Sequence, residues 1–402
     1  MRRFIAALIA TATLLLFACE KKAPRPGSET GAQGAALASG AVSLPQGASP
    51  AGDVILIGEV GSLTGAEATF GISTRNGIEM AVKEANAAGG VKGKKLLVRV
   101  YDDQGKPEEA ANAVTRLISE KVKLILGEVA SSNSLAMAPK AQQAGVPMIT
   151  PSSTNPKVTA VGDYIFRVCF IDPFQGYVMA RFARDKLKLA NIAVLKDQKS
   201  DYSLGLSDVF INKFTEMGGK IVSTVAYAKG DTDFRAQLTA IKGTKPEAIY
   251  VPGYYTDVGI IARQARELGI KVPLLGGDGW ESEKLFELGG SAVEGSYYTN
   301  HYSQDDPSPQ VQKFIASYKS AYGAVPDSLG ALGYDAARVG IQAMQRASDV
   351  SGPALRDAIA ATRDFPAVAG TITLDRSRNA VKPAVVLKVV GGKTQFVTTV
   401  AP

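Results

Sequence analysis

Two series of apolar strands alternating with helices dominate the sequence and restrict its fold more than any other feature. The first series begins with VILIGEVG at 54–61, a continuous apolar run of the kind that is buried on both faces of a parallel sheet. The alternation starts again after Asp172, with DPFQGYVMARFARDKLK followed by NIAVLKD. Such alternation is typical of parallel sheets with right-handed crossovers. The sequence therefore predicts an α/β fold with two doubly wound units in tandem.

Local signals place the individual elements. A helix is predicted over 76–90, where NGIEMAVKEANAAGG ends at a glycine pair, and Pro107 suits the first position of the next helix. The C-terminal part cannot form a third core alone, so we expect it to join the two units, with the chain crossing between them more than once. Its predicted helices lie around 307–322, 328–348 and 353–362, and its strands near 369–375 and 383–398.

The N-terminus carries a targeting signal rather than part of the fold. Two arginines precede fifteen apolar or small residues, and a run of this length is shorter than the roughly 20 residues that span a bilayer. It suits a signal-peptide core, so residues 1–18 are predicted to be cleaved. The run ends in LFAC, which resembles the bacterial lipobox, although Phe17 is larger than usual at its position. We expect Cys19 to be lipidated; a plain signal peptide cleaved nearby is the alternative.

Residues 19–52 are predicted to form a lipidated, flexible tether. After Cys19 the segment is rich in Ala, Gly, Ser and Pro and lacks apolar periodicity. With Cys19 carrying lipid, Cys169 in the apolar stretch FRVCF is the one cysteine left. We expect a buried, inert thiol there rather than a disulfide partner or a nucleophile.

Composition excludes several classes of protein. With 46% hydrophobic and 21% charged residues, 402 residues are enough for a well-cored globular protein of two domains. The 45 basic residues exceed the 38 acidic ones, but two arginines belong to the signal peptide and the rest are spread along the chain. Because no Lys/Arg stripe with interleaved aromatic residues occurs, we expect no nucleic-acid partner.

Catalytic motifs are missing from the sequence. The single histidine, His301 in NHYSQDD, lies far from any GxSxG elbow, so a serine hydrolase would lack its base. GGVKGKK does not have the spacing of a phosphate-binding loop, and GGDGWE does not continue as GxGxxG. One histidine and two cysteines cannot supply a zinc site. We therefore expect a binding protein with no catalytic residue, metal or cofactor.

Polar residues follow two neighbouring strands of the first unit. In EVASSNS, Ser131 and Ser132 lie where a helix begins, and TPSSTNP at 150–156 follows the next strand. Ligands of parallel α/β sheets bind beyond the carboxyl ends of the strands, where helix N-termini favour anions. We expect the two loops together to hold one carboxylate. For either stretch alone the alternative is structural, an N-cap serine and a polar turn.

Six stretches carry a resemblance to a known family; in order they are GEVGSLTG, EVASSNS, ITPSSTNP, FRVCFIDPFQG, GYYTD and LLGGDGW. They resemble the bacterial leucine/isoleucine/valine-binding proteins, the type I substrate-binding proteins of branched-chain amino-acid ABC transporters. The similarity covers about residues 53–398. It implies two Rossmann-like lobes joined by three crossovers that close over a ligand. One lobe would be 53–172 plus 302–380, and the other 173–301 plus 381–402.

The resemblance also implies roles for individual residues. Ser131 and Thr154 match residues that hold the ligand's carboxylate, and the Ser152 carbonyl matches an acceptor for its amino group. In the other lobe Asp278 matches an acid that pairs with the ammonium, although the relatives carry Glu there, and Trp280 two residues later puts the depth of the pocket in doubt. The aromatic positions near the ligand are Phe70, Tyr202 and Tyr254.

The function implied by the resemblance is transport. A monomeric lipoprotein, anchored to a membrane in the periplasm or on another extracytoplasmic face, would capture a branched-chain or other apolar amino acid and deliver it to an ABC transporter permease. The alternatives are a urea, amide or aromatic-acid binder of the same family, a ligand-sensing receptor domain, and a purely structural surface lipoprotein. Asp278 discriminates among them, because a ligand without an ammonium would leave a buried carboxylate unneutralised.

Overall fold

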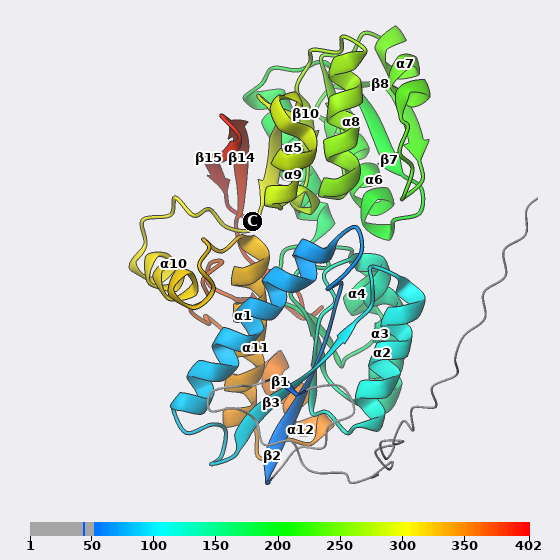
Figure 1. Ribbon diagram of the computed structural model, residues 1–402. Coiled ribbons are helices and arrows are strands. Elements are labelled where there is room, and N and C mark those ends of the chain that lie inside the picture. The colour runs from blue at the N-terminus through cyan, green and yellow to red at the C-terminus, as the bar shows by residue number, and fades with distance from the viewer. Residues whose placement is uncertain (1–42, 45–51) are drawn as a thin grey trace, which may run out of the picture. The chain divides into compact units, whose positions relative to one another are not determined.

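A computed structural model describes residues 43–44 and 52–402 (Figure 1). The predicted signal peptide at 1–18, Cys19 and most of the predicted tether lie outside the described residues. Within the tether, β1 (Ser43–Leu44) pairs in parallel with β3 (Lys95–Asp102). This short strand was not predicted, because pairing with a free sheet edge depends on backbone groups rather than on a side-chain pattern.

The first sheet has six parallel strands in the order β1-β3-β2-β4-β5-β6. Its central strand β2 (Val54–Gly61) buries Ile55 and Ile57 on one face and Leu56 and Val60 on the other, in two separate apolar clusters. Both faces are therefore dry, as the continuous apolar run predicts. The remaining strands are β4 (Leu124–Leu126), β5 (Met148–Thr150) and β6 (Ile165–Arg167).

Helices cover both faces of the first sheet. α2 and α3 pack on one face, and α1 and α11 lie side by side on the other (Figure 1). α2 shows why its sequence forms a helix: Pro107 opens it, and Ala110, Ala113, Val114 and Leu117 form its buried stripe. The helices that belong to this part are α1 (Ala68–Ala87), α2 (Pro107–Ser119), α3 (Ser131–Ala144), α4 (Lys157–Ala160), α10 (Pro309–Tyr322), α11 (Ser328–Arg346) and α12 (Gly352–Ala360).

Helix α1 begins at Ala68, eight residues before the predicted start at Asn76. Its first turns contain polar residues that obscure the apolar period. Thr69 Oγ1 lies 3.0 Å from Ser282 Oγ, and Ser73 Oγ donates to Asp327 Oδ2 at 2.6 Å. These partners come from distant parts of the chain, so tertiary contacts rather than local periodicity extend the helix.

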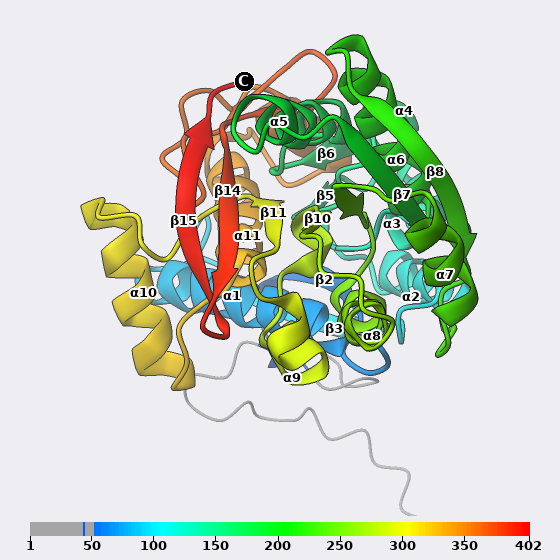
Figure 2. The same ribbon diagram turned by 90° about the horizontal axis from the view of Figure 1, so that it is seen from above.

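The second sheet has seven strands in the order β15-β14-β11-β10-β9-β7-β8. From β8 to β11 the pairs are parallel, whereas β14 and β15 add an antiparallel hairpin beside β11 (Figure 2). The single strand predicted over 383–398 is thus a hairpin that turns at Gly391 and Gly392, both with positive φ. The strands are β7 (Asn191–Asp197), β8 (Lys220–Tyr227), β9 (Ala248–Tyr250), β10 (Leu274–Gly276), β11 (Tyr297–Asn300), β14 (Ala384–Val390) and β15 (Lys393–Val400).

The helices of the second lobe pack around this sheet and share one apolar cluster with it. They are α5 (Asp172–Asp185), α6 (Asp201–Glu216), α7 (Arg235–Gly243), α8 (Tyr255–Glu267) and α9 (Glu283–Gly289), with short 3-10 turns at η1 (Asp278–Trp280) and η2 (Gly290–Val293).

The chain passes between the two sheets three times within residues 52–402. The crossings lie between β6 and β7, between β11 and α10, and between the small strand pair β12 (Thr373–Leu374) and β13 (Ala380–Val381) and β14. α10, α11 and α12 bury Phe314, Leu332 and Leu355 in the same apolar cluster as Ile57 of β2. Within the described residues, the C-terminal part therefore packs into the core of the first lobe and adds a hairpin to the second sheet.

The predicted α/β class with two doubly wound lobes is confirmed. Leaving aside β1 and the C-terminal hairpin, both sheets place their second strand outside the first, which creates a switch point next to β2 and next to β7. Ligands of such sheets bind outside the carboxyl ends of the strands at the switch point. Nowhere in the described residues is a helix both long and apolar enough to cross a membrane.

Candidate functional site

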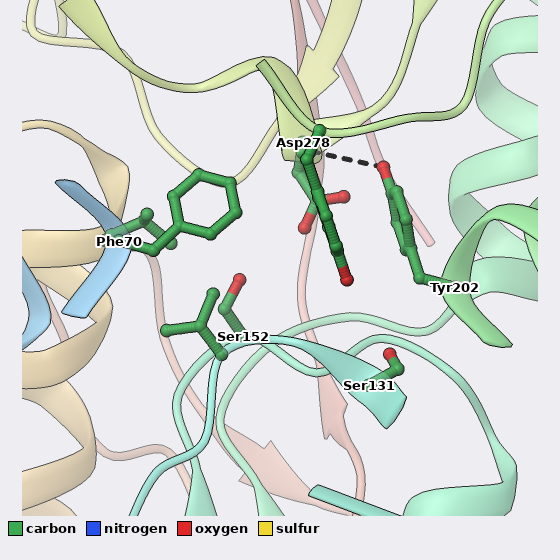
Figure 3. Close-up of a pocket in the computed structure, with 9 residues that line it drawn as sticks. Phe70, Ser131, Ser152, Tyr202 and Asp278 are labelled. Carbon is green, nitrogen blue, oxygen red and sulfur yellow. Dashed lines mark hydrogen bonds between the residues drawn. The ribbon is translucent and has the colours of Figure 1, made fainter. Parts of the chain in front are cut away.

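A pocket lies where the carboxyl ends of strands from both sheets meet. Every lining residue except Phe70 and Leu329 belongs to a loop or helix start that follows β4, β5, β7, β9 or β10. Figure 3 shows Phe70, Ser131, Ser152, Tyr202 and Asp278 around it. The lining residues are Phe70, Val129, Ser131, Ser152, Tyr202, Tyr254, Asp278, Gly279 and Leu329.

Six of the seven predicted ligand residues line this one pocket. The exception is Thr154, which lies on the same loop as Ser152 but is not among the lining residues. Its side chain is 1% exposed, and its Oγ1 has no hydrogen-bond partner in residues 52–402. The pocket thus brings together predicted residues that lie up to 208 positions apart, from Phe70 to Asp278, and that come from both lobes.

Ser131 opens helix α3 and points its hydroxyl toward the loop after β5. Ala130 is the N-cap residue, so neither Ser131 nor Ser132 has the capping role considered from the sequence. The Ser131 Oγ accepts the Asn155 N–H at 3.3 Å, which ties the two strand-end loops together. At this position the N–H groups of the first helical turn and the Ser131 hydroxyl face the same space, an arrangement that favours an anion.

A buried carboxyl network holds the start of α3 in place. Glu128 is fully buried, and its carboxyl group accepts the Ser62 N–H at 3.0 Å and the Ser62 hydroxyl at 3.1 Å. The Ser62 hydroxyl also contacts Asp103, whose other oxygen accepts the Asn133 side-chain amide at 2.8 Å. Burial, and then the neighbouring Asp103, raise the pKa of Glu128 well above its ordinary value. The ends of β2, β3 and β4 are therefore locked to α3 by a network that the sequence did not reveal.

On the opposite lobe, Asp278 faces the pocket from the loop after β10. Its backbone N–H donates to Gln175 Oε1 at 2.9 Å, and the next N–H, of Gly279, donates to the Tyr202 hydroxyl at 3.1 Å (Figure 3). Only glycine fits at 279, because a Cβ there would come within 2.8 Å of the Gly253 carbonyl oxygen and of the Tyr254 ring. The loop that carries Asp278 is therefore held rigidly against the aromatic wall of the pocket.

One carboxylate oxygen of Asp278 is free to meet a ligand. Asp278 is 7% exposed, and its Oδ2 lies 2.8 Å from His301 Nε2. Its Oδ1 is buried and has no hydrogen-bond partner among the described residues. A buried carboxylate oxygen without a partner is costly, so this atom calls for a cationic or hydrogen-bond-donating group from the ligand.

Three aromatic rings form the apolar wall. Tyr202 and Tyr254 stack with ring centroids 5.3 Å apart and planes 9° from parallel. Phe70 of α1 meets Tyr254 edge to face, with centroids 5.4 Å apart and an interplanar angle of 88°. Burial, and then Asp278, raise the pKa of Tyr202 well above its ordinary value, so its hydroxyl remains neutral at physiological pH. This wall suits an apolar side chain rather than a second charge.

A further buried acid stands behind the loop that carries Thr154. Burial raises the pKa of Asp172 to about 7, and Asp278 adds to the effect, while the Thr154 hydroxyl and the Arg167 guanidinium oppose it. The Thr154 hydroxyl is near enough to influence Asp172, but neither Thr154 Oγ1 nor Asp172 Oδ2 has a hydrogen-bond partner of normal geometry in residues 52–402. Asp172 is therefore partly neutral near pH 7, and Asp278 is the acid that lines the pocket.

Direct bonds join the two lobes around the pocket. Ser132 Oγ donates to Asp201 Oδ2 at 2.8 Å and accepts the Asp201 N–H at 3.0 Å, so Ser132 binds the opposite lobe rather than lining the pocket. Thr256 Oγ1 donates to the Ala66 carbonyl at 2.6 Å on the other side. The free space in the pocket is about 10 Å³, which is room for one water molecule. A larger ligand therefore needs the lobes to separate before it can enter.

Sequence reasoning missed some residues of the site and misjudged another. Val129 and Leu329 line the pocket, and His301 supports Asp278 from behind. His301 was considered only as a catalytic base, and no local motif links it to Asp278. Trp280 is fully buried and does not line the pocket, and its Nε1 donates to the Val251 carbonyl at 2.9 Å.

Cys169 is a buried free thiol, and burial raises its pKa to about 12. Across residues 43–44 and 52–402, no group of three or more His, Cys, Asp or Glu side chains could hold a metal ion. Neither observation supplies a nucleophile or a metal centre to the pocket.

Comparison with known proteins places this architecture among binding proteins. A family model described as periplasmic binding protein matches residues 54–393. The leucine-, isoleucine-, valine-, threonine- and alanine-binding protein of Pseudomonas aeruginosa is 30% identical over 331 residues, which cover 81% of this chain and 87% of that protein.

Two solved structures are similar in both sequence and fold. A leucine-binding protein from Thermotoga maritima is 42% identical with a TM-score of 0.84, covering 87% of this chain and 99% of that one. A branched-chain amino-acid transporter substrate-binding protein from Streptococcus pneumoniae, in complex with isoleucine, is 33% identical with a TM-score of 0.82, covering 87% of this chain and 100% of that one.

Proposed function

Because the chain belongs to the periplasmic binding protein family, within its Leu/Ile/Val-binding group, we propose that it binds an apolar α-amino acid in the pocket between its lobes. The family consists of substrate-binding proteins and not of enzymes. Relatives named for binding leucine, isoleucine and valine support the choice of a branched-chain side chain.

The observation that carries the proposal is the unpartnered Oδ1 of Asp278, which faces the same pocket as Ser131 at the start of α3. A zwitterion would place its ammonium against Asp278 in one lobe. Its carboxylate would then meet the Ser131 hydroxyl and the helix N–H groups in the other lobe, with Thr154 behind them and the Ser152 carbonyl accepting from the amino group. Affinity and lobe closure are thereby coupled, because only the closed state satisfies both ends of the ligand.

The side chain of the ligand would contact the apolar wall. Phe70, Tyr254 and Leu329 present ring and methyl surfaces, and Tyr202 stacks behind Tyr254. Burial of a leucine-sized side chain contributes roughly 1.5–3 kcal/mol. A ligand without an ammonium, such as an aromatic acid or an amide, would leave Asp278 buried and uncompensated, so the pocket disfavours those alternatives.

The binding experiment compares L-leucine with 4-methylpentanoate, which lacks the amino group, by isothermal titration calorimetry. We expect L-leucine to bind and 4-methylpentanoate to bind at least a hundredfold more weakly. Asp278→Asn should cost on the order of 3 kcal/mol for leucine, because the ammonium loses its counter-charge in a desolvated pocket. Asp185→Asn is the control, since Asp185 is an acid of the same lobe that pairs with Arg181 on the surface of α5, outside the pocket lining. Equal binding of the two ligands, or an unaffected Asp278→Asn variant, would refute the proposal.

We further propose that the loaded protein delivers its ligand to the permease of an ABC transporter from the outer side of the membrane. The family to which the chain belongs serves such transporters. A lipid at Cys19 would keep it near the permease as a monomer. Deletion of the gene should abolish saturable leucine uptake at low concentration, and the Asp278→Asn protein should fail to restore it.

A further inference from the structure

The two carboxylate oxygens of Asp278 have different surroundings. Oδ2 lies 2.8 Å from His301 Nε2, whereas Oδ1 has no partner in the described part of the chain. Because the carboxylate can only accept, the ring nitrogen in this contact carries the proton. The bond therefore determines which carboxylate oxygen is left for the ligand.

His301 is itself held where two of the crossings meet. It directly follows β11, and its ring stacks on Phe170 of the first crossing, with centroids 3.8 Å apart and planes 25° from parallel. Its backbone N–H donates to the Asn300 side-chain oxygen at 2.8 Å. The residue is 3% exposed, so its ring has little freedom to turn.

His301 also lines a second cavity, although its imidazole has no exposed surface. This cavity, of about 370 Å³, is lined by His301 together with Tyr302, Pro383 and Phe396, at the second and third crossings. Nδ1 of His301 has no hydrogen-bond partner among the described residues. Asp278 is therefore the one hydrogen-bond partner of the His301 ring among the described residues.

We propose that His301 is the positioning residue of Asp278: its Nε2–H holds Oδ2, and so turns Oδ1 toward the ammonium of the bound amino acid. The inference rests on the proposed function. A neutral His301 leaves one full negative charge on the pair for the ammonium to balance. A protonated His301 would already neutralise Asp278, and the two cations would compete for one carboxylate.

The surroundings of the ring favour the neutral form. Burial lowers the pKa of His301 below its ordinary value, and the Lys382 ammonium acts in the same direction, while Asp278 opposes them. The titratable groups that face His301 are Asp278 and Lys382; those that face Asp278 besides His301 are Cys169, Asp172, Tyr202, Tyr250 and Tyr254.

Two substitutions separate the role of the bond from the role of packing. His301→Gln retains an N–H donor that can reach Oδ2 but cannot become charged. His301→Leu keeps an apolar side chain against Phe170 but removes the donor. At pH 7.5 we expect His301→Leu to bind L-leucine about tenfold more weakly than the parent, as for the loss of a hydrogen bond to a charged group. His301→Gln should recover the affinity to within about threefold.

A comparison of two ligands gives a readout that packing alone would not move. His301→Leu should weaken the binding of L-leucine but leave the weaker binding of 4-methylpentanoate unchanged, because that ligand has no ammonium for Oδ1 to meet. In an Asp278→Asn background, His301→Leu should cost less than about threefold, because the histidine then has no carboxylate to position.

Several results would overturn the inference. They are an unchanged affinity for leucine in His301→Leu, an equal loss for leucine and 4-methylpentanoate in that variant, or an undiminished cost of His301→Leu beside Asp278→Asn. If the parent protein binds no amino acid at all, both the proposed function and this inference are wrong. If it binds leucine but the variants do not differ as described, only the positioning role of His301 is wrong. Thermal melting of each variant confirms that it is folded.

Discussion

Lys229, after β8 in one lobe, forms an ion pair with Glu67, at the start of α1 in the other, with Nζ and Oε2 3.1 Å apart. Lys229 Nζ also donates to the Gly105 carbonyl at 3.0 Å, so this side chain makes two polar contacts with the opposite lobe. Glu67 is 3% exposed, and Lys229 is the cation nearest to it and to the buried Asp257. These contacts exist only when the lobes are together.

We therefore predict that Lys229→Met shifts the lobes toward the open arrangement. Removing the cation leaves Glu67 facing Asp257 without compensation, at a cost of about 1–2 kcal/mol in the closed state, less than for a fully buried pair because Lys229 is partly exposed. Small-angle scattering should show a larger radius of gyration at subsaturating leucine, and calorimetry an affinity about tenfold lower. Lys213→Met is the control, since Lys213 pairs with Glu216 on the surface of a single helix. An unaltered radius and affinity would remove this pair from the closure mechanism.

Ser131 and Ser132 are adjacent, but their substitution by alanine should weaken ligand binding in different ways. Ser131→Ala removes a hydroxyl from the carboxylate end of the pocket and should cost about 1–2 kcal/mol for leucine, since the helix N–H groups remain. The loss should be smaller for leucinamide, which has no carboxylate. Ser132→Ala breaks the bond to Asp201 between the lobes and should weaken both ligands equally. Titration of both variants with both ligands decides; equal losses for Ser131→Ala would contradict its role at the carboxylate.

Glu59 should make the protein less stable as the pH rises. It is fully enclosed in the first lobe, neither carboxylate oxygen has a partner in residues 52–402, and burial raises its pKa to about 8. Between about pH 4.5 and 8 the folded state retains a proton that the unfolded state has lost, so the free energy of unfolding falls through this window. The loss from this group approaches about 4 kcal/mol at pH 8.5.

The test of Glu59 is the difference between parent and Glu59→Gln in urea unfolding at pH 5 and pH 8.5. Any change that the amide itself makes to the free energy of unfolding is the same at both pH values. Between pH 5 and pH 8.5, however, the free energy of unfolding should fall by several kcal/mol in the parent and not in the variant, because the amide has no proton to lose. Glu108→Gln, at an exposed acid in the first turn of α2, is the control. A constant difference across the pH range would mean that Glu59 titrates normally.

Cys169 should be unreactive in the native protein. Its thiol is fully buried with a pKa of about 12, so the thiolate is scarce at pH 8. A thiol reagent added to protein beginning after Cys19 should modify no cysteine until denaturant unfolds the first crossing. Rapid native labelling would show that this crossing opens far more readily than its packing indicates.

Acylation at Cys19 remains a prediction from the sequence LFAC. Intact-mass measurement of the membrane fraction should find a mature N-terminus carrying acyl chains, and Cys19→Ser protein should leave the membrane. An unmodified terminus would instead support the plain signal peptide.

The fold was accessible from local pattern because the central strands of both sheets are buried on two faces. Strands such as β2 therefore read as continuous apolar runs, and helices such as α2 display their buried stripe every three to four residues. The start of α1 and the strand β1 were not accessible, since their partners lie elsewhere in the chain. The β14–β15 turn was missed for another reason: two glycines interrupt an apolar stretch too briefly to separate two strands by composition.

The site divides along the same line. Ser131 and Ser152 follow neighbouring strands whose carboxyl ends must meet in any parallel sheet, so the sequence by itself determined that they would come together. Asp278 entered through a family resemblance rather than through any local signal. That Asp278 lines the pocket, that His301 contacts one of its oxygens, and that Leu329 and Lys229 approach from remote segments were decided by the tertiary structure alone. Such contacts depend on how two lobes dock and where three crossings pack, and the free energy of that packing is a property of surfaces brought together, which no short stretch of sequence contains.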